Sequence, residues 1–133
     1  MTTLIDKIAW IYVVDGQILV ARSKGKDIYY LPGGKRETDE TDVDTLLREI
    51  EEELSVRIKP ETVLHFGTFE AGAHGKSEGM HVKMTCYTGD FEGELRPASE
   101  IEELVWLTYH DRDRVSPVCQ IIFDKLSEMK LLS

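Results

Sequence analysis

Apolar residues first cluster in two short runs, 7–14 and 17–22, which are rich in Ile and Val and are separated by Asp15-Gly16. An Asp-Gly pair readily adopts the positive φ angles of a two-residue hairpin turn. Two such runs on either side of such a pair are typical of antiparallel strands. The pattern therefore predicts a β-hairpin over residues 6–24.

A loop and then an amphipathic helix are predicted next. Residues 24–35 contain Pro32-Gly33-Gly34, which interrupts regular structure. Thr41 is the best N-cap, because Asp44 follows three residues later and acids are favoured in the first helical turn. The apolar residues after this cap recur at the spacing of one helix face. They are Val43, Leu46, Leu47, Ile50 and Leu54.

The second half of the chain is predicted to add strands and a closing helix. Residues 62–71 and 80–91 have strand patterns, and from Met80 to Cys86 apolar and polar residues alternate. Residues 72–79 form a Gly-rich polar loop, and 104–110 form another short strand. Residues 116–132 read as a helix with Ser116 as its cap and Pro117 at its first position. This order of elements predicts one mixed sheet covered by helices.

Composition and charge narrow the classes of function. The chain has 133 residues and a formal net charge of −9, which disfavours non-specific nucleic-acid binding. No apolar run approaches the ~20 residues that span a membrane, and the start of the chain lacks the features of a signal peptide. Cys86 and Cys119 lack zinc-site spacing. We therefore expect a cytoplasmic protein that needs a cation to handle phosphates.

The predicted first helix carries an unusual cluster of acids. Glu49, Glu52 and Glu53 stand at i, i+3 and i+4, so their carboxylates share one side of the helix, with Arg48 at i−4 from Glu52. Carboxylates this close repel each other, and a hard divalent cation such as Mg²⁺ or Mn²⁺ removes that repulsion. A solvated acidic face is the alternative interpretation, and composition alone favours it.

The spacing of these acids from the preceding loop decides between the two interpretations. Gly34 is followed after five residues by Glu40, and after seven more by Arg48-Glu49-Ile50-x-Glu52-Glu53-x-Ser55-Val56. This segment, residues 34–56, resembles the Nudix box, and the one fixed position that differs is the last Gly, which is Ser55 here. A chance match in one chain is on the order of one in a hundred thousand or rarer.

The resemblance has consequences for fold and function. It implies an α/β protein with the Nudix fold, an α/β/α sandwich around a mixed β-sheet, formed as a single domain by residues 1–133. It also implies hydrolysis of the diphosphate linkage of a small-molecule nucleotide with Mg²⁺, or Mn²⁺ as the alternative ion. Partners other than that substrate are limited to a second copy of the chain, so a monomer or homodimer is expected, without nucleic acid or membrane.

The resemblance also assigns roles to box residues. Glu49, Glu52 and Glu53 would bind the metal, together with the backbone carbonyl of Gly33. Arg48 and Glu40 would orient these carboxylates. The base that takes the proton of the attacking water would be one of the box glutamates or Glu100, chosen from the acids that precede Trp106.

Substrate contacts are assigned more broadly. Gly34 would let backbone approach the phosphates, and Arg22 and Lys35 would contact them. Cys119 and Gln120 occupy about the position at which related enzymes read a purine, although a thiol lacks the paired donor and acceptor of an amide. His74 is the histidine predicted to touch the substrate. Ser55 would adopt the left-handed conformation that ends the helix, at a cost of about 1 kcal/mol.

Marks of several Nudix subfamilies are missing beyond the box, in residues 69–75. By elimination, the predicted substrate is a nucleoside triphosphate, cut to the monophosphate and pyrophosphate. The alternatives are an ADP-ribose or nucleotide-sugar pyrophosphatase and, from another class, a non-catalytic nucleotide-binding Nudix module. Such modules usually lose box carboxylates, and this chain keeps all of them.

Overall fold

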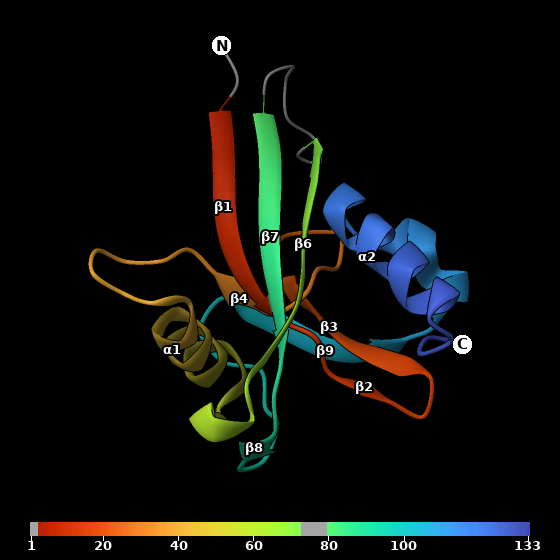
Figure 1. Cartoon of the computed structure of the whole chain (residues 1–133). Coiled ribbons are helices and arrows are strands. Elements are labelled where there is room, and N and C mark those ends of the chain that lie inside the picture. The colour runs from red at the N-terminus through yellow and green to blue at the C-terminus, as the bar shows by residue number, and fades with distance from the viewer. Residues whose placement is uncertain (1–2, 73–79) are drawn as a thin grey trace.

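The computed structural model describes residues 3–72 and 80–133, which form strands and two α-helices (Figure 1). The first half contains β1 (Thr3–Trp10), β2 (Val13–Val14), β3 (Gln17–Ser23), β4 (Gly33–Gly34), α1 (Asp42–Leu54) and β5 (Arg57–Ile58). The second half contains β6 (Leu64–Gly72), β7 (Met80–Thr88), β8 (Phe91–Glu92), β9 (Ile101–Leu107) and α2 (Pro117–Glu128). Two 3₁₀ helices lie at Pro60–Thr62 and Tyr109–Arg114.

The strands form one larger and two smaller sheets. The larger sheet has the order β4-β1-β7-β6, with β1 and β7 parallel and the other pairs antiparallel. The second sheet has the order β2-β3-β9, and β5 pairs with β8. The predicted mixed sheet is therefore confirmed, although the strands divide among more than one sheet.

The predicted hairpin is correct at its turn but wrong in its first strand. Asp15 and Gly16 have φ angles of 51° and 79° and connect β2 to β3. The longer strand β1 pairs with β4 and β7 instead of β3. The chain passes from the larger sheet to the second sheet at Ile11 and Tyr12. The Ile11 amide donates to the Tyr87 carbonyl of β7, whereas the Tyr12 carbonyl accepts from the Leu19 amide of β3.

Helix α1 begins and ends as its sequence predicts. Thr41 is the N-cap, its hydroxyl accepts from the Asp44 amide at 3.1 Å, and the Asp44 carboxylate accepts from the Thr41 amide at 3.1 Å. Ser55 ends the helix with φ 65° and ψ 21°, which confirms the left-handed conformation. The apolar stripe is buried through Leu46, Ile50 and Leu54, which join a core cluster with Ile8 and Trp10 of β1.

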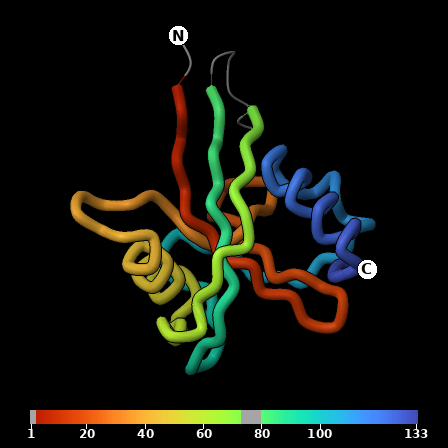
Figure 2. Tube along the Cα trace, in the orientation of Figure 1, coloured from red at the N-terminus to blue at the C-terminus, as the bar shows by residue number. Residues whose placement is uncertain are grey.

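The two α-helices lie on opposite sides of the larger sheet (Figure 2). Ile8 and Trp10 belong to the core cluster of α1, while Ala9 and Ile11 belong to that of α2. Successive residues of a strand point to opposite faces, so β1 separates the two cores. The helices therefore sandwich the sheet, as the α/β/α prediction requires.

Helix α2 supplies much of the second core. Pro117 is its first residue, as predicted, and its fixed φ suits that position. Its buried face is apolar. Within residues 3–72 and 80–133, no helix is long and apolar enough to span a bilayer. The buried residues of α2 are Val118, Cys119, Ile122, Phe123 and Leu126.

One alternation prediction is only partly correct. Met84 and Cys86 of β7 are buried on one face, as predicted. Thr85 was expected to face outward, yet it is only 9% exposed. Both faces of this part of β7 are covered, and the Thr85 hydroxyl hydrogen-bonds with Thr68 at 3.5 Å.

Candidate active site

Glu53 is a buried carboxylate in the last turn of α1, with only 3% of its surface exposed. The backbone amide of Gly33 donates to its Oε1 at 3.2 Å. Burial raises the pKa of Glu53 to about 8, and the negative charges of Glu49 and Glu100 add to this effect. Burying an acid is costly, so its position at this edge of the sheet calls for a functional explanation.

The Gly pair of β4 makes close contact between β1 and α1 possible. A Cβ on Gly34 would lie 2.3 Å from the carboxyl carbon of Glu49, and one on Gly33 would lie 2.0 Å from the carbonyl oxygen of Ile8. The Glu49 carboxyl group is the end of a flexible side chain and could move away, whereas the Ile8 backbone could not, so the backbone contact excludes a side chain at Gly33. The two glycines therefore bring backbone directly against the acids of α1, and substrate contact by Gly34 stays a prediction.

Arg48 connects the acids at the start of the box with those of the helix. Its guanidinium donates to both carboxylate oxygens of Glu40, at 2.7 and 2.9 Å, and to Glu49 at 3.0 Å. It also donates to the Lys35 carbonyl at 3.0 Å. The two bonds from Arg48 to Glu40, together with one from the Glu37 amide, lower the pKa of Glu40 to about 2. These contacts are what the predicted orienting role of Arg48 and Glu40 requires.

Glu52 is more exposed than Glu49 and Glu53. Its carboxylate is about half exposed and stands 3.7 Å from the Arg48 guanidinium. Across residues 3–72 and 80–133, no three His, Cys, Asp or Glu side chains converge in metal-binding geometry. Glu49 and Glu53 thus meet inside the site while Glu52 sits at its rim, and the metal-binding role of the three stays a prediction.

Glu100 lies just before β9, and two residues earlier the Ala98 amide donates to the Glu53 carbonyl at 2.9 Å. The neighbouring Glu103 faces elsewhere, where it accepts from Arg22 at 3.0 Å and from the Tyr29 hydroxyl. The segment that carries Glu100 is therefore joined to the last turn of α1, and the role of Glu100 stays a prediction.

The remaining predicted substrate residues are scattered. Arg22 is held by Glu103 and donates to the Lys26 carbonyl at 2.9 Å. Lys35 directly follows β4 and has an exposed side chain. Neither arrangement tests phosphate contact, although the Arg22 guanidinium would have to leave an ion pair to make it.

The residues predicted to read a base lie at the start of α2. The Gln120 side chain donates to the Arg112 carbonyl at 3.1 Å. Cys119 has 0% exposure, so its thiol has no surface with which to contact a base unless the surrounding core opens. His74, also predicted to touch the substrate, lies outside the described residues.

Two features near the site were missed by sequence reasoning. Arg36 bridges Asp6 of β1 and Asp42 of α1, and Asp42 also accepts from the Tyr87 hydroxyl. Lys7 lies on β1 with its ammonium 5.8 Å from the centre of the Tyr30 ring. A charged residue within an otherwise apolar strand run was the signal that could have drawn attention to Lys7.

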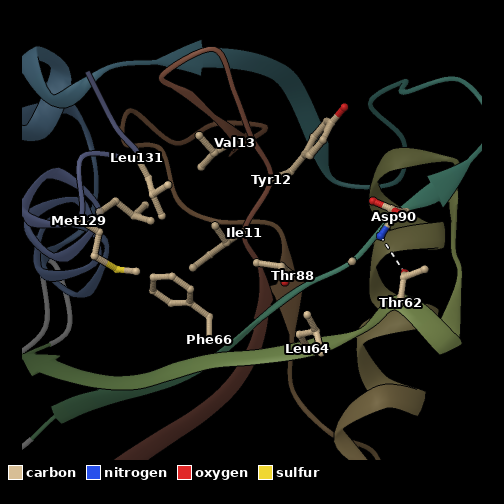
Figure 3. Close-up of a pocket in the computed structure, with 12 residues that line it drawn as sticks. Ile11, Tyr12, Val13, Thr62, Leu64, Phe66, Thr88, Asp90, Met129 and Leu131 are labelled. Atoms are coloured by element: carbon tan, nitrogen blue, oxygen red, sulfur yellow. Dashed lines mark hydrogen bonds between the residues drawn. The ribbon is translucent and has the colours of Figure 1, made fainter.

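A pocket of about 600 Å³ lies away from these acids, between the β1–β2 connection, β6 and the C-terminal end of α2 (Figure 3). Its walls are mainly apolar, with Ile11, Phe66 and Met129 among them, and Asp90 at one rim. None of the predicted site residues lines it. We therefore place the candidate active site at α1 and β4.

The fold and the site together define an α/β protein with a Gly-Gly strand packed against a glutamate-rich helix. The NUDIX domain model matches residues 6–118, so the chain belongs to the Nudix family. With every carboxylate of the box present, it is an enzyme of the Nudix hydrolase class. Family, fold and enzyme class are thus confirmed.

Similar solved structures agree with this assignment. The E. coli ORF135 protein is 25% identical, with a TM-score of 0.75 over 97% of this chain and 92% of that one. A MutT NUDIX hydrolase from Burkholderia pseudomallei is 24% identical, with a TM-score of 0.73 over 93% and 98%. No curated protein matches the sequence.

A Francisella tularensis enzyme shares the fold with only part of its length. This bifunctional NMN adenylyltransferase/ADP ribose pyrophosphatase, complexed with AMP and a Mn ion, is 24% identical with a TM-score of 0.64. The match covers 96% of this chain and 42% of that one.

Proposed function

We propose that this Nudix hydrolase cleaves a nucleoside triphosphate to the monophosphate and pyrophosphate, with Mg²⁺ or alternatively Mn²⁺. The observation that carries the proposal is the buried Glu53 carboxylate, which lies beside Glu49 and Glu100 and accepts from the Gly33 amide. We further propose that residues 1–133 act as one domain, in the cytoplasm, as a monomer or homodimer.

The donor set fits a hard divalent cation. We propose Glu49, Glu52, Glu53 and the Gly33 carbonyl as its ligands, all of which are oxygen donors. A carboxyl group with a pKa raised to about 8 is neutral for much of the time at pH 7, and a nearby cation would favour its ionised form. When bound, the cation would neutralise phosphate oxygens and make a water molecule more acidic.

The chain's own residues would keep this site in order. The Gly33 amide fixes the direction of one Glu53 oxygen, and Arg48 fixes one Glu49 oxygen. Glu40 holds Arg48 through two bonds, so a change at Glu40 would act through Arg48. We propose a box glutamate or Glu100 as the group that accepts the proton of the attacking water, which is supported by the influence of the Glu49 and Glu100 charges on Glu53.

A second candidate substrate is ADP-ribose or a nucleotide sugar. It is favoured by the likeness to the Francisella tularensis enzyme, which includes an ADP ribose pyrophosphatase. A nucleotide-binding module without activity is the third alternative, and the retained box carboxylates oppose it.

Hydrolysis assays test the proposal. Wild-type protein is incubated with Mg²⁺ and a panel of nucleoside triphosphates, ADP-ribose and nucleotide sugars, and products are resolved as pyrophosphate or phosphate. We expect pyrophosphate from triphosphates, with activity lowered more than about 100-fold in Glu53→Gln, because direct ligands should matter more than their supports. Glu51→Gln is the matched control, since Glu51 is an exposed acid of the same helix.

Three results would reject the proposal. If the protein releases AMP from ADP-ribose and leaves the triphosphates intact, ADP-ribose replaces the nucleoside triphosphate as the proposed substrate. Full activity of Glu53→Gln would show that this site is not catalytic. A failure of the wild type to hydrolyse any of the compounds with Mg²⁺ would show the same.

A further inference from the structure

Lys7 is a half-buried ammonium on the face of β1 that also carries Ala9, whose core cluster includes the buried residues of α2. The side chains of Lys7 and Ala9 share this face because residues two apart in a strand point the same way. The Lys7 ammonium lies 5.8 Å from the centre of the Tyr30 ring. A cation at this distance from an aromatic ring is attracted to it.

Tyr30 contacts Lys7 and is within electrostatic range of two acids of the candidate active site. Burial is the main cause that raises the pKa of Tyr30, and the negative charges of Glu53 and Glu100 add to it. Its hydroxyl also hydrogen-bonds with Ser23. The ring of Tyr30 thus has the acids within electrostatic range and Lys7 close by.

Lys7 is on the same face of β1 as Ala9, whose core cluster includes Cys119 at the start of α2. Burial raises the pKa of the Cys119 thiol, and the positive charge of Lys7 is among the influences that oppose this shift. Lys7 therefore lies within electrostatic range of the helix end at which base-reading residues were predicted, where the thiol itself is inaccessible.

The arginines near the site are already paired with acids. Arg22 pairs with Glu103, Arg48 with Glu40, and Arg36 with Asp6 and Asp42. Over residues 3–72 and 80–133, the structure gives Lys7 neither an ion pair with an acid nor a side-chain hydrogen bond. Its ammonium keeps three donors for a ligand.

We propose that Lys7 is a specificity-determining residue that donates a hydrogen bond to a carbonyl oxygen of the substrate's nucleobase. This inference rests on the proposed function, because it assumes that the phosphates bind at Glu49 and Glu53. Because Lys7 is on the α2 face of β1, the rest of the nucleotide then passes the β4 edge of the sheet, beside Tyr30, toward Lys7 and α2.

The chemistry of an ammonium selects among bases. Guanine offers O6 and N7 as adjacent acceptors, and uracil offers carbonyl oxygens, whereas adenine places an amino donor beside N7. A group with three donors and no acceptor therefore favours bases with a carbonyl oxygen over adenine. The proposed substrate class is accordingly a guanine, uracil or cytosine nucleotide.

The first experiment compares GTP, UTP and CTP with ATP for wild type, Lys7→Met and Lys7→Arg. We expect wild type to prefer the carbonyl-bearing bases. Lys7→Met should raise their KM by roughly 10–100-fold, the effect of one charge-assisted hydrogen bond, with kcat little changed. Lys7→Arg should restore part of the preference. Lys125→Met is the control, because Lys125 is an exposed lysine on the outer side of α2.

A second experiment separates base contact from phosphate contact and does not require turnover. GTP or inorganic tripolyphosphate is titrated in the presence of Mg²⁺ into two proteins, and binding is measured by calorimetry. One protein carries Glu53→Gln alone, and the other carries Glu53→Gln together with Lys7→Met. Weaker binding of GTP alone supports the proposal. Equal weakening of tripolyphosphate, or unchanged binding of both, overturns it. If wild type hydrolyses no nucleotide, the proposed function fails while this titration still decides the role of Lys7.

Discussion

The two α-helices have similar lengths but bury different chemistry. Helix α1 buries the Glu53 carboxylate beside its leucines, whereas every buried residue of α2 is apolar or a thiol. Burial raises the pKa of both Glu53 and Cys119, but only at Glu53 do neighbouring carboxylates raise it further. The difference indicates that α2 is built for stability, while α1 gives up stability to hold an acid.

Polar contacts stabilise other parts of α1 but not the buried acid itself. The capping box of Thr41 and Asp44 satisfies backbone donors at its start, and Arg48 neutralises Glu40 and Glu49 on the exposed side. Neither contact removes the cost of burying Glu53, which keeps only the Gly33 amide as a donor within the described residues. Substitutions in the two helices should therefore have different signatures.

The largest expected effect is on stability, at the α2 core. Phe123→Ala should lower the free energy of unfolding by about 3–5 kcal/mol, because Phe123 is fully buried and its removal leaves a cavity. Urea denaturation measures this loss. Activity per folded molecule should be retained, since Phe123 lies on the helix away from the acids. Ile121→Ala, at an exposed position of the same helix, should cost far less, and equal losses would contradict the comparison.

The next effect concerns the pH dependence of stability at α1. Burial gives Glu53 a pKa of about 8 in the folded protein, against an ordinary value of 4.5. A raised carboxyl pKa stabilises the folded state most below about pH 4.5, and this contribution is lost as pH rises toward 8. Without divalent cations, wild type should therefore lose stability over this range, by on the order of a few kcal/mol.

A difference between two proteins isolates this titration. Thermal unfolding of wild type and Glu53→Gln is measured from pH 4.5 to 8 in a chelating buffer. The Tm of wild type should fall relative to that of Glu53→Gln, because the amide does not ionise. Mg²⁺ should restore the wild-type Tm at pH 8. A constant difference in Tm across this range would show that Glu53 does not titrate there.

The features that lie within each helix were largely predictable from sequence. The cap at Thr41, the apolar stripe from Leu46 to Leu54 and Pro117 at the start of α2 are local patterns, and all are confirmed. The Nudix box likewise gave the family, because its spacing lies within one continuous segment.

Features that depend on distant pairing were not predictable. The apolar run from Lys7 to Val14 gives no sign that the chain changes sheets at Ile11 and Tyr12. Cys119 was expected to face a base, but packing against β7 and α2 neighbours buries it completely. Helical spacing likewise groups Glu52 with Glu53, yet the tertiary contacts of Gly33 select only Glu53 for burial.

A smaller effect compares an arginine beside each helix. Arg48 orients Glu49 near α1, and Arg112 pairs with Asp124 of α2 at 2.7 Å. Arg48→Met should weaken Mn²⁺ binding, followed by calorimetry, by roughly 10–100-fold, because it removes a support of the predicted ligands. Arg112→Met should leave Mn²⁺ binding unchanged and alter stability by at most about 1 kcal/mol, as for an exposed ion pair. Equal Mn²⁺ affinities in the two variants would contradict the role of Arg48.

The smallest effect tests how α1 ends, where the chain departs from the Nudix box. Ser55 has φ 65°, a left-handed conformation that costs a non-glycine residue about 1 kcal/mol. Ser55→Gly removes this strain but also the 3.3 Å hydrogen bond to the Arg96 carbonyl, and it adds freedom to the unfolded chain. The net gain should be about 0.5 kcal/mol in urea denaturation. Ser55→Ala keeps the strain and loses the bond, so it should destabilise, and a glycine variant no more stable than the alanine variant would show that the conformation at this position is not strained.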